Sequence, residues 1–263
     1  MTIRRLTQTA SLLFLHSSRG FDLKWICNPV LSCHSCVLSW FACPIGVFVH
    51  YSGYHLFPFF AVGMVLLIGA LFGRLLCGWV CPFGFLQDIL HKIPGRKYSL
   101  PGWAGMVKYP VLIVTVLLIP FFLGEETAYS FCRFCPASAI QVTLPNLIAA
   151  GFAEIPHTTL IKLGILGIIL LGVTVSSRAF CKVLCPIGAL FAPLNLLSFW
   201  TIRMPAEACV SCSKCDKTCP TAVTPSSRIV RGIPPNRSLD CVVCHDCQTV
   251  CPTKTRKQTA EPD

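Results

Sequence analysis

The stretch Arg74-Leu75-Leu76-Cys77-Gly78-Trp79-Val80-Cys81-Pro82-Phe83-Gly84 contains the pattern R-x2-C-x3-C-P-x-G. The same pattern occurs a second time, in Arg178-Ala179-Phe180-Cys181-Lys182-Val183-Leu184-Cys185-Pro186-Ile187-Gly188. Each copy follows an apolar run and places two cysteines four residues apart before a proline. Positions i and i+4 of a helical turn lie on one face, and the helix ends before the proline. The repeat therefore predicts two equivalent helix ends that face each other about a pseudo-two-fold axis. A Cys-Pro pair precedes each copy, at Cys43-Pro44 and Cys135-Pro136.

The composition indicates a membrane protein. Of the 263 residues, 54% are hydrophobic and 13% are charged, and the mean hydropathy is +0.66, which is too apolar for an ordinary soluble domain. The 18 cysteines favour cofactor ligation, because disulfide-rich scaffolds are small secreted domains without long apolar spans. The net charge of +11 comes from basic residues at the ends of apolar segments, so it follows the positive-inside pattern and does not indicate nucleic-acid binding.

Three apolar stretches are long enough to cross a hydrocarbon core of about 30 Å, namely residues 56–76, 103–123 and 158–180. A fourth, residues 6–26, contains charged side chains and is a spanning helix, an interfacial helix or a signal-like segment. The loop before residue 103 is basic, whereas residues 124–156 are mostly acidic among their charged side chains. This asymmetry predicts a multi-pass protein of the cytoplasmic (inner) membrane, with everything after about Met204 in the cytoplasm.

The expected architecture has two parts. Residues 1–204 are predicted to form an all-α membrane bundle of about four transmembrane helices with an internal two-fold repeat, carrying Cys-Pro motifs at both faces. Residues 205–263 are polar and dense in cysteine. They are predicted to form a small α+β domain of the bacterial ferredoxin type.

The terminal cysteines have the spacing of a two-cluster ferredoxin. The run C-x2-C-x2-C-x3-C-P occurs at residues 209–220 and again at 241–252, and the fourth cysteine of each such run ligates the other cluster. One [4Fe–4S] cluster is therefore assigned to Cys209, Cys212, Cys215 and Cys251, and the other to Cys241, Cys244, Cys247 and Cys219. Paired zinc sites or disulfides are the weaker alternatives, because zinc motifs lack this four-cysteine run and a reducing cytoplasm disfavours disulfides.

The repeated motif supplies a third candidate site. Two i, i+4 cysteine pairs that face each other bring four thiolates together, so a third [4Fe–4S] cluster is predicted between Cys77, Cys81, Cys181 and Cys185. The alternative is that these thiols only pack, since free cysteine is a common small buried side chain.

Six further cysteines are expected at the exterior face: Cys27, Cys33, Cys36, Cys43, Cys132 and Cys135. The pairs Cys33/Cys36 and Cys132/Cys135 are natural partners for a fourth cluster, although six cysteines exceed one cluster and fall short of two. Disulfides are a serious alternative, because an oxidising exterior permits them. Clusters at both faces would allow electrons to cross the bilayer.

These motifs resemble the NapH/MauN-type membrane ferredoxins, which are related to the membrane domains of NosR and CcoG. The resemblance rests on Arg74 with Cys77-Gly78-Trp79-Val80-Cys81-Pro82, on Cys181, Cys185-Pro186, Gly188 and Ala189, and on the two terminal runs, so that it extends from about Gly73 to the C-terminus. It implies that electrons pass from membrane quinol, or another cytoplasmic-side donor, toward a periplasmic reductase or cytochrome. The exterior cysteines depart from the nitrate-reductase subunits of the family, which places the quinol step in doubt and favours a cluster-to-cluster route.

The sequence thus predicts an electron-transfer subunit of a larger membrane redox complex, with an exterior cytochrome or reductase and quinone among the candidate partners. Whether it forms part of an enzyme such as a quinol dehydrogenase stays open. Two other functions remain as alternatives: an assembly or metal-handling factor for another metalloprotein, and a thiol–disulfide relay that uses the exterior cysteines. No catalytic residue is predicted.

Overall fold

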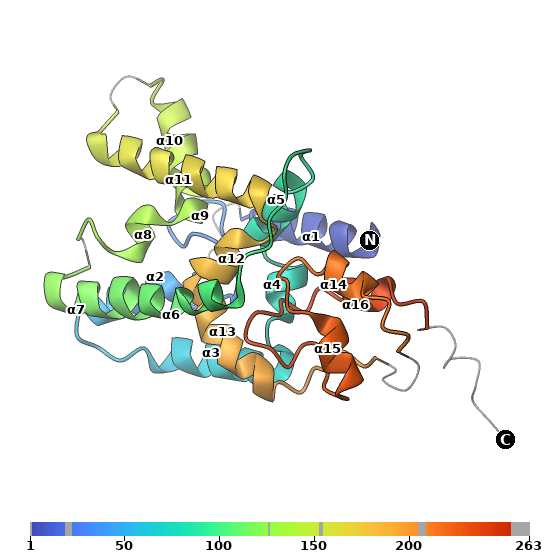
Figure 1. The fold of residues 1–263 in the computed structure, drawn as a ribbon. Coiled ribbons are helices and arrows are strands. Elements are labelled where there is room, and N and C mark those ends of the chain that lie inside the picture. The colour runs from blue at the N-terminus through green and yellow to red at the C-terminus, as the bar shows by residue number, and fades with distance from the viewer. Residues whose placement is uncertain (1, 19–22, 126, 153–154, 205–208, 254–263) are drawn as a thin grey trace.

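The computed structural model describes residues 2–18, 23–125, 127–152, 155–204 and 209–253 (Figure 1). The N-terminal half begins with α1 (Thr2–Leu15) and α2 (Pro44–Gly53). The first copy of the repeat follows as α3 (Phe59–Phe72), α4 (Leu75–Trp79) and α5 (Pro82–Leu90). Helix α1 packs along α5 and α4.

The longest helix of the structure is built from consecutive segments over Gly102–Leu123. It contains a 3₁₀ segment η1 (Gly102–Met106), α6 (Lys108–Val111), a π-helical segment η2 (Leu112–Leu118) and α7 (Ile119–Leu123). A second interrupted run holds α8 (Phe131–Phe134), α9 (Pro136–Ser138), the π-helical η3 (Ala139–Thr143) and α10 (Leu144–Ala149). The second copy of the repeat is α11 (His157–Val175), α12 (Ala179–Val183) and α13 (Pro186–Leu197).

Two helices in the described residues are long and apolar enough to cross a membrane, Gly102–Leu123 and His157–Val175. The prediction of about four spans was therefore wrong. Within residues 56–76 the helix α3 has only 14 residues, about 21 Å at 1.5 Å per residue, because Gly73 ends it with a left-handed φ of 59°. Within residues 6–26 the helix α1 ends at Leu15, and residues 19–22 lie outside the described residues.

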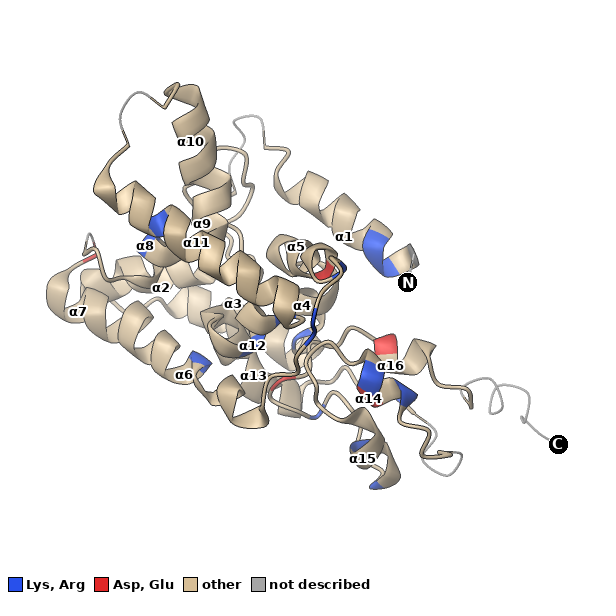
Figure 2. Ribbon diagram, turned by 45° about the horizontal axis from the view of Figure 1, so that its top comes forward, with Lys and Arg blue, Asp and Glu red and all other residues tan. Residues whose placement is uncertain are grey.

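Both long helices leave most of their apolar surface uncovered. Leu160, Ile161, Ile168 and Leu171 of α11 are each more than half exposed. A continuous apolar face of this kind suits contact with lipid. Figure 2 shows charged residues around α14 to α16 and at the adjoining ends of α1, α5 and α6, with others at α8 and α11 and beside α7. The structure thus supports membrane association.

The terminal segment is also helical, so the predicted α+β ferredoxin domain was wrong. Its helices are α14 (Lys214–Thr218), α15 (Pro225–Val230) and α16 (Asp246–Thr249). Throughout the described residues no strand forms, and the only β-type pairing is an isolated bridge between Cys27 and Ala42. The physical reason is local: the cysteine runs coil through left-handed residues, which interrupt extended backbone. These are Ser211, Ser213, Ala222, Thr224, Val243 and His245.

The terminal segment packs on the ends of the repeat helices. Asn195 of α13 donates through Nδ2 to the carbonyls of Asn236, Ser238 and Cys241. Trp79 donates through Nε1 to the Val243 carbonyl at 3.1 Å. In Figure 1 the terminal helices lie beyond one end of the long helices, and α8 lies toward the other end.

Gly78 allows this close approach, since a Cβ there would collide with the Val242 carbonyl oxygen. We expect Gly78→Ala to lower the free energy of unfolding by about 1–3 kcal/mol through overpacking. Gly164→Ala in α11 is the matched control, because a Cβ there meets nothing within 4 Å. Thermal unfolding in detergent and protease release of the terminal segment measure the effect; equal behaviour of the two variants would contradict the packing.

Candidate metal centres

Each of the four Cys-Pro pairs before Met204 begins a helix in the same way. The cysteine is the extended N-cap residue and the proline occupies the first turn, where its missing N–H costs nothing. The thiol then faces the free amides of that turn, and the amide three residues further on stabilises its anionic form. The thiol and amide pairs are Cys43 with Gly46, Cys81 with Gly84, Cys135 with Ser138, and Cys185 with Gly188.

The repeat brings Cys77, Cys81, Cys181 and Cys185 together, and we call this set the central cage. All four thiols are buried. Burial raises the pKa of Cys81 to about 12, and the neighbouring Cys181 and Cys77 raise it further. Burial likewise raises the pKa of Cys185, and the neighbouring Cys181, Cys77 and Cys81 raise it further. The thiols that act on one another's charge in this way lie near each other.

Two buried arginines cross between the halves of the repeat at this cage. Arg74 donates to the Cys181 carbonyl at 3.3 Å, and Arg178 donates to the Cys77 carbonyl at 2.8 Å. Arg74 is 1% exposed and Arg178 is 0% exposed. Gly84 lies against the Arg178 guanidinium and Gly188 against that of Arg74. Each arginine therefore supports the cysteine pair of the other repeat, as a pseudo-two-fold arrangement requires.

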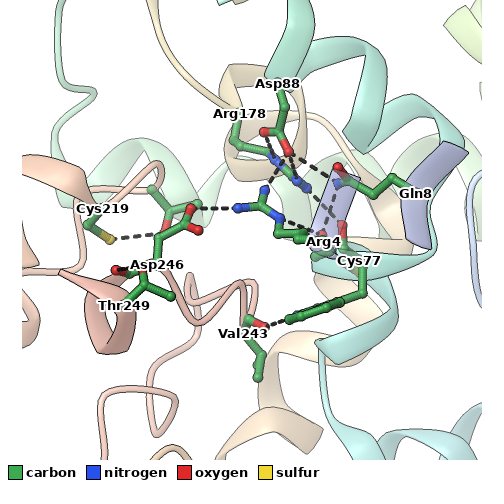
Figure 3. Close-up of polar contacts among 12 residues, drawn as sticks. Arg4, Gln8, Cys77, Asp88, Arg178, Cys219, Val243, Asp246 and Thr249 are labelled. Atoms are coloured by element: carbon green, nitrogen blue, oxygen red, sulfur yellow. Dashed lines mark hydrogen bonds and ion pairs between the residues drawn. The ribbon is translucent and has the colours of Figure 1, made fainter. Parts of the chain in front are cut away.

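A network of ion pairs connects the cage to the N-terminus and the terminal segment (Figure 3). Asp88 accepts from Arg178 Nε at 2.7 Å and from Nη2 at 2.6 Å. Arg4 also binds Asp88 and reaches Asp246 of α16 at 2.5 Å. Burial opposes ionisation of Asp88, but Arg178 and Arg4 outweigh it and hold its pKa below the usual range.

The first terminal cage consists of Cys209, Cys212, Cys215 and Cys251. These four cysteines line one cavity, together with Met204, Ile229 and backbone of both cysteine runs. The geometry brings Cys251 of the second run to three cysteines of the first, which is the pairing that the ferredoxin spacing predicts.

The second terminal cage consists of Cys219, Cys241, Cys244 and Cys247. Burial raises the pKa of Cys247 to about 12, with Cys241, Cys219 and Cys215 adding to the rise. The Val223 amide approaches the Cys219 sulfur at 3.5 Å, and the Val243 amide approaches the Cys241 sulfur at 3.4 Å. Such N–H···S contacts stabilise thiolates and tune the potential of a bound cluster.

Of the six predicted exterior cysteines, four line a common cavity: Cys33, Cys43, Cys132 and Cys135. We call this set the outer cage. Cys27 and Cys36, although both are described, line no part of that cavity. Cys27 instead pairs with Ala42 in the isolated bridge. The structure thus places Cys43 where the sequence spacing had favoured Cys36.

The donor sets suit iron–sulfur clusters. Each cage offers four sulfur donors, and a cluster held by four thiolates is anionic, so it needs compensating donors nearby. At the central cage Arg74 Nε is buried without a hydrogen-bond partner, which leaves a cationic donor for an anionic group. Gln87 Nε2 also donates to the Cys181 sulfur at 2.9 Å. Within the described part of the chain, no three or more Cys, His, Asp or Glu side chains form a site for a single metal ion.

Sequence reasoning missed several supporting residues. Gln87, Asp88, Arg4 and Asn195 were not assigned to the cages. Only the repeated arginines carried a pattern, because each precedes the first cysteine of its motif by three residues.

A helical chain with buried four-cysteine cages defines an iron–sulfur protein, and comparison with known proteins agrees. The chain matches the family model described as "4Fe-4S binding domain" over residues 54–101 and 158–203, which contain the two copies of the repeat. No solved structure matches it.

Three relatives illustrate the similarity. The "Putative electron transport protein YccM" of Escherichia coli (strain K12) is 32% identical over 167 residues, which cover 60% of this chain and 44% of YccM. The "Methylamine utilization ferredoxin-type protein MauN" of Methylobacillus flagellatus is 28% identical over 166 residues, covering 60% of this chain and 53% of MauN. The "Regulatory protein NosR" of Pseudomonas aeruginosa is 30% identical over 173 residues, covering 60% of this chain and 22% of NosR. The match thus spans about half, or less, of each relative.

These matches confirm the resemblance: the chain is similar to the NapH/MauN/NosR-type 4Fe–4S ferredoxin-type proteins.

Asp88 provides a test of the ion-pair network. We expect Asp88→Asn to lower the free energy of unfolding by about 2–3 kcal/mol, because Arg178 loses its charged partner while buried. The pKa of Asp88 is depressed in the folded state, so its contribution is complete above the unfolded pKa of about 3.9 and is lost as the pH falls below it. The difference between wild type and variant should stay constant from about pH 7 to 5 and shrink below about pH 4.

Chemical unfolding followed by tryptophan fluorescence measures this difference. Glu125→Gln is the control, because Glu125 pairs with His50, whose side chain is 55% exposed, and such a pair is worth less than about 1 kcal/mol. An equal loss in both variants would contradict the role of Asp88.

Proposed function

We propose that the protein carries electrons through [4Fe–4S] clusters held by the central cage and the two terminal cages. The observation that carries this proposal is the adjacency of the three cages. Cys215 of the first terminal cage acts electrostatically on Cys247 of the second. Arg74 acts on Cys77 of the central cage and on Cys241 of the second terminal cage.

Each cluster, when bound, would exchange one electron at a time, and the chain sets its potential through ligation, burial and hydrogen bonds to sulfur. In this chain, burial and hydrogen bonding differ between the cages. The central cage is enclosed and bordered by Arg74 and Arg178. In the first terminal cage Cys212 is exposed. A partner in solution would therefore exchange electrons at the first terminal cage, and the central cage would pass them within the membrane part.

The relatives support this role. The printed name of YccM refers to electron transport, and that of MauN to a ferredoxin-type protein. By analogy, this chain would work with other proteins of a redox complex. Quinone as a substrate stays a prediction from the resemblance.

We further propose that residues 1–204 form the membrane part and that residues 205–263 form the terminal part at the cytoplasmic side of the inner membrane. Basic residues that flank the two long helices support this orientation. Arg96 and Lys97 precede the first helix, and Arg178 and Lys182 follow the second. Basic residues beside the ends of membrane-spanning helices favour the cytoplasmic side.

The proposal predicts that Cys77→Ser combined with Cys181→Ser removes about four irons per chain and leaves the terminal clusters in place. Cys27→Ser, outside every cage, is the control and should retain all iron. Iron and acid-labile sulfide analysis of anaerobically purified full-length protein measures the loss. EPR after stepwise reduction, together with stopped-flow bleaching by a low-potential donor, shows whether electrons still spread beyond the terminal part.

An unchanged iron content in the double variant would overturn the central site. If the reduced wild-type protein showed no EPR signal, electron transfer as the function would be overturned.

A further inference from the structure

The outer cage combines a cavity with buried sulfur donors from distant parts of the chain. Cys33 and Cys43 come from the segment before α2, whereas Cys132 and Cys135 flank α8. Their four side chains line one cavity, and Lys162 of α11 lines it too. Cys33 donates through its backbone amide to Gln141 Oε1 at 2.7 Å, so the two cysteine pairs are held in fixed relation by η3.

We propose that Cys33, Cys43, Cys132 and Cys135 ligate a further [4Fe–4S] cluster, and that Cys27 and Cys36 take no part in it.

The local backbone of this cage repeats that of the central cage. Cys43 and Cys135 are helix N-caps before proline, as Cys81 and Cys185 are. Amides of the first turn stabilise the anionic forms of Cys43 and Cys135. A helix N-terminus favours an anion because its amides and dipole are both oriented toward it. Each of the two cages therefore contains two cysteines that are N-caps before proline and are stabilised by amides of the first helical turn.

Charge compensation also follows the central pattern, with a lysine in place of two arginines. Lys162 lies within an apolar helix, where an ionisable side chain is costly unless it has a partner. Its Nζ donates to Ser138 Oγ at 2.8 Å, beside the Cys135 N-cap. The cationic group acts electrostatically on Cys132. A bound anionic cluster would supply the partner that this lysine needs.

Two consecutive backbone amides join the outer cage to the central cage. The Leu31 amide stabilises the Cys81 thiolate, and the Ser32 amide stabilises the Cys43 thiolate. One sulfur of each set thus contacts the same short backbone segment, so the two cages lie near each other. Two reduced clusters held near each other would interact magnetically through their unpaired electrons.

The test compares Cys43→Ser and Cys132→Ser with Cys36→Ser as the matched control, using anaerobically purified full-length protein. We expect each of the first two variants to lose about four irons and the matching sulfide, while Cys36→Ser loses none. The wild type, when fully reduced, should show EPR splitting between the outer and central clusters that both ligand variants lack. Retained EPR signals of the terminal clusters confirm that each variant has folded.

Lys162→Gln provides a second measurement, because loss of a nearby positive charge makes reduction of an anionic cluster harder. The midpoint potential of one cluster should fall while the iron content stays unchanged. Three results would overturn the proposal: unchanged iron in Cys43→Ser and Cys132→Ser, an equal iron loss in Cys36→Ser, or a disulfide among the four cysteines in non-reducing mass spectrometry. In each of these cases, iron retained at the central and terminal cages would still support the proposed function.

Discussion

The arrangement depends on two buried cations, Arg74 and Arg178. Burial of a guanidinium is very costly unless its charge is paired and its N–H groups are hydrogen-bonded. Arg178 meets this need with Asp88 and the Cys77 carbonyl. The Arg74 guanidinium donates to the carbonyls of Leu239 and Cys181, leaves Nε without a partner, and interacts with the Cys77 thiol. No carboxylate pairs with Arg74 among the ion pairs of the described residues, so the cysteine sulfurs beside it are the groups whose negative charge would compensate its own.

Arg74 also attaches the terminal segment to the helices, together with Lys108 and Arg4. Arg74 donates to the Leu239 carbonyl at 2.8 Å, and Lys108, which is fully buried, binds the neighbouring Asp240 at 2.6 Å. Arg4 joins Asp88 to Asp246. Since these contacts enter the terminal segment on both sides of Cys241 and Cys244, the position of the second terminal cage is fixed relative to the central cage. Electron exchange over short distances requires such fixed spacing, because small displacements would alter the path.

Sequence reasoning predicted the iron–sulfur class of the protein but not its architecture. Cysteine spacing and the repeat carried the grouping of the central and terminal cysteines, because a ligand set is encoded in local residue order. Helix length was less predictable: the apolar stretch at residues 56–76 reads as one span, yet Gly73 and the N-cap at Cys81 divide the region into α3, α4 and α5. The outer cavity is lined by Cys43 and not by Cys36, and Cys33 of this cavity contacts Gln141 of η3, 108 positions away in the chain. No local pattern encodes such a contact.

Burial changes systematically along the cages, and this ordering follows from how each is built. The central cage lies where two repeats meet, so all four of its cysteines are buried. In the second terminal cage, Cys244 and Cys247 are buried while Cys219 and Cys241 are partly accessible. In the first terminal cage Cys212 is exposed. Solvent stabilises added charge less well in the interior, so the enclosed cage requires the fixed cations Arg74 and Arg178, whereas the accessible cage can depend on water. The positions of the arginines are thus a consequence of the depth at which the repeat places its thiols.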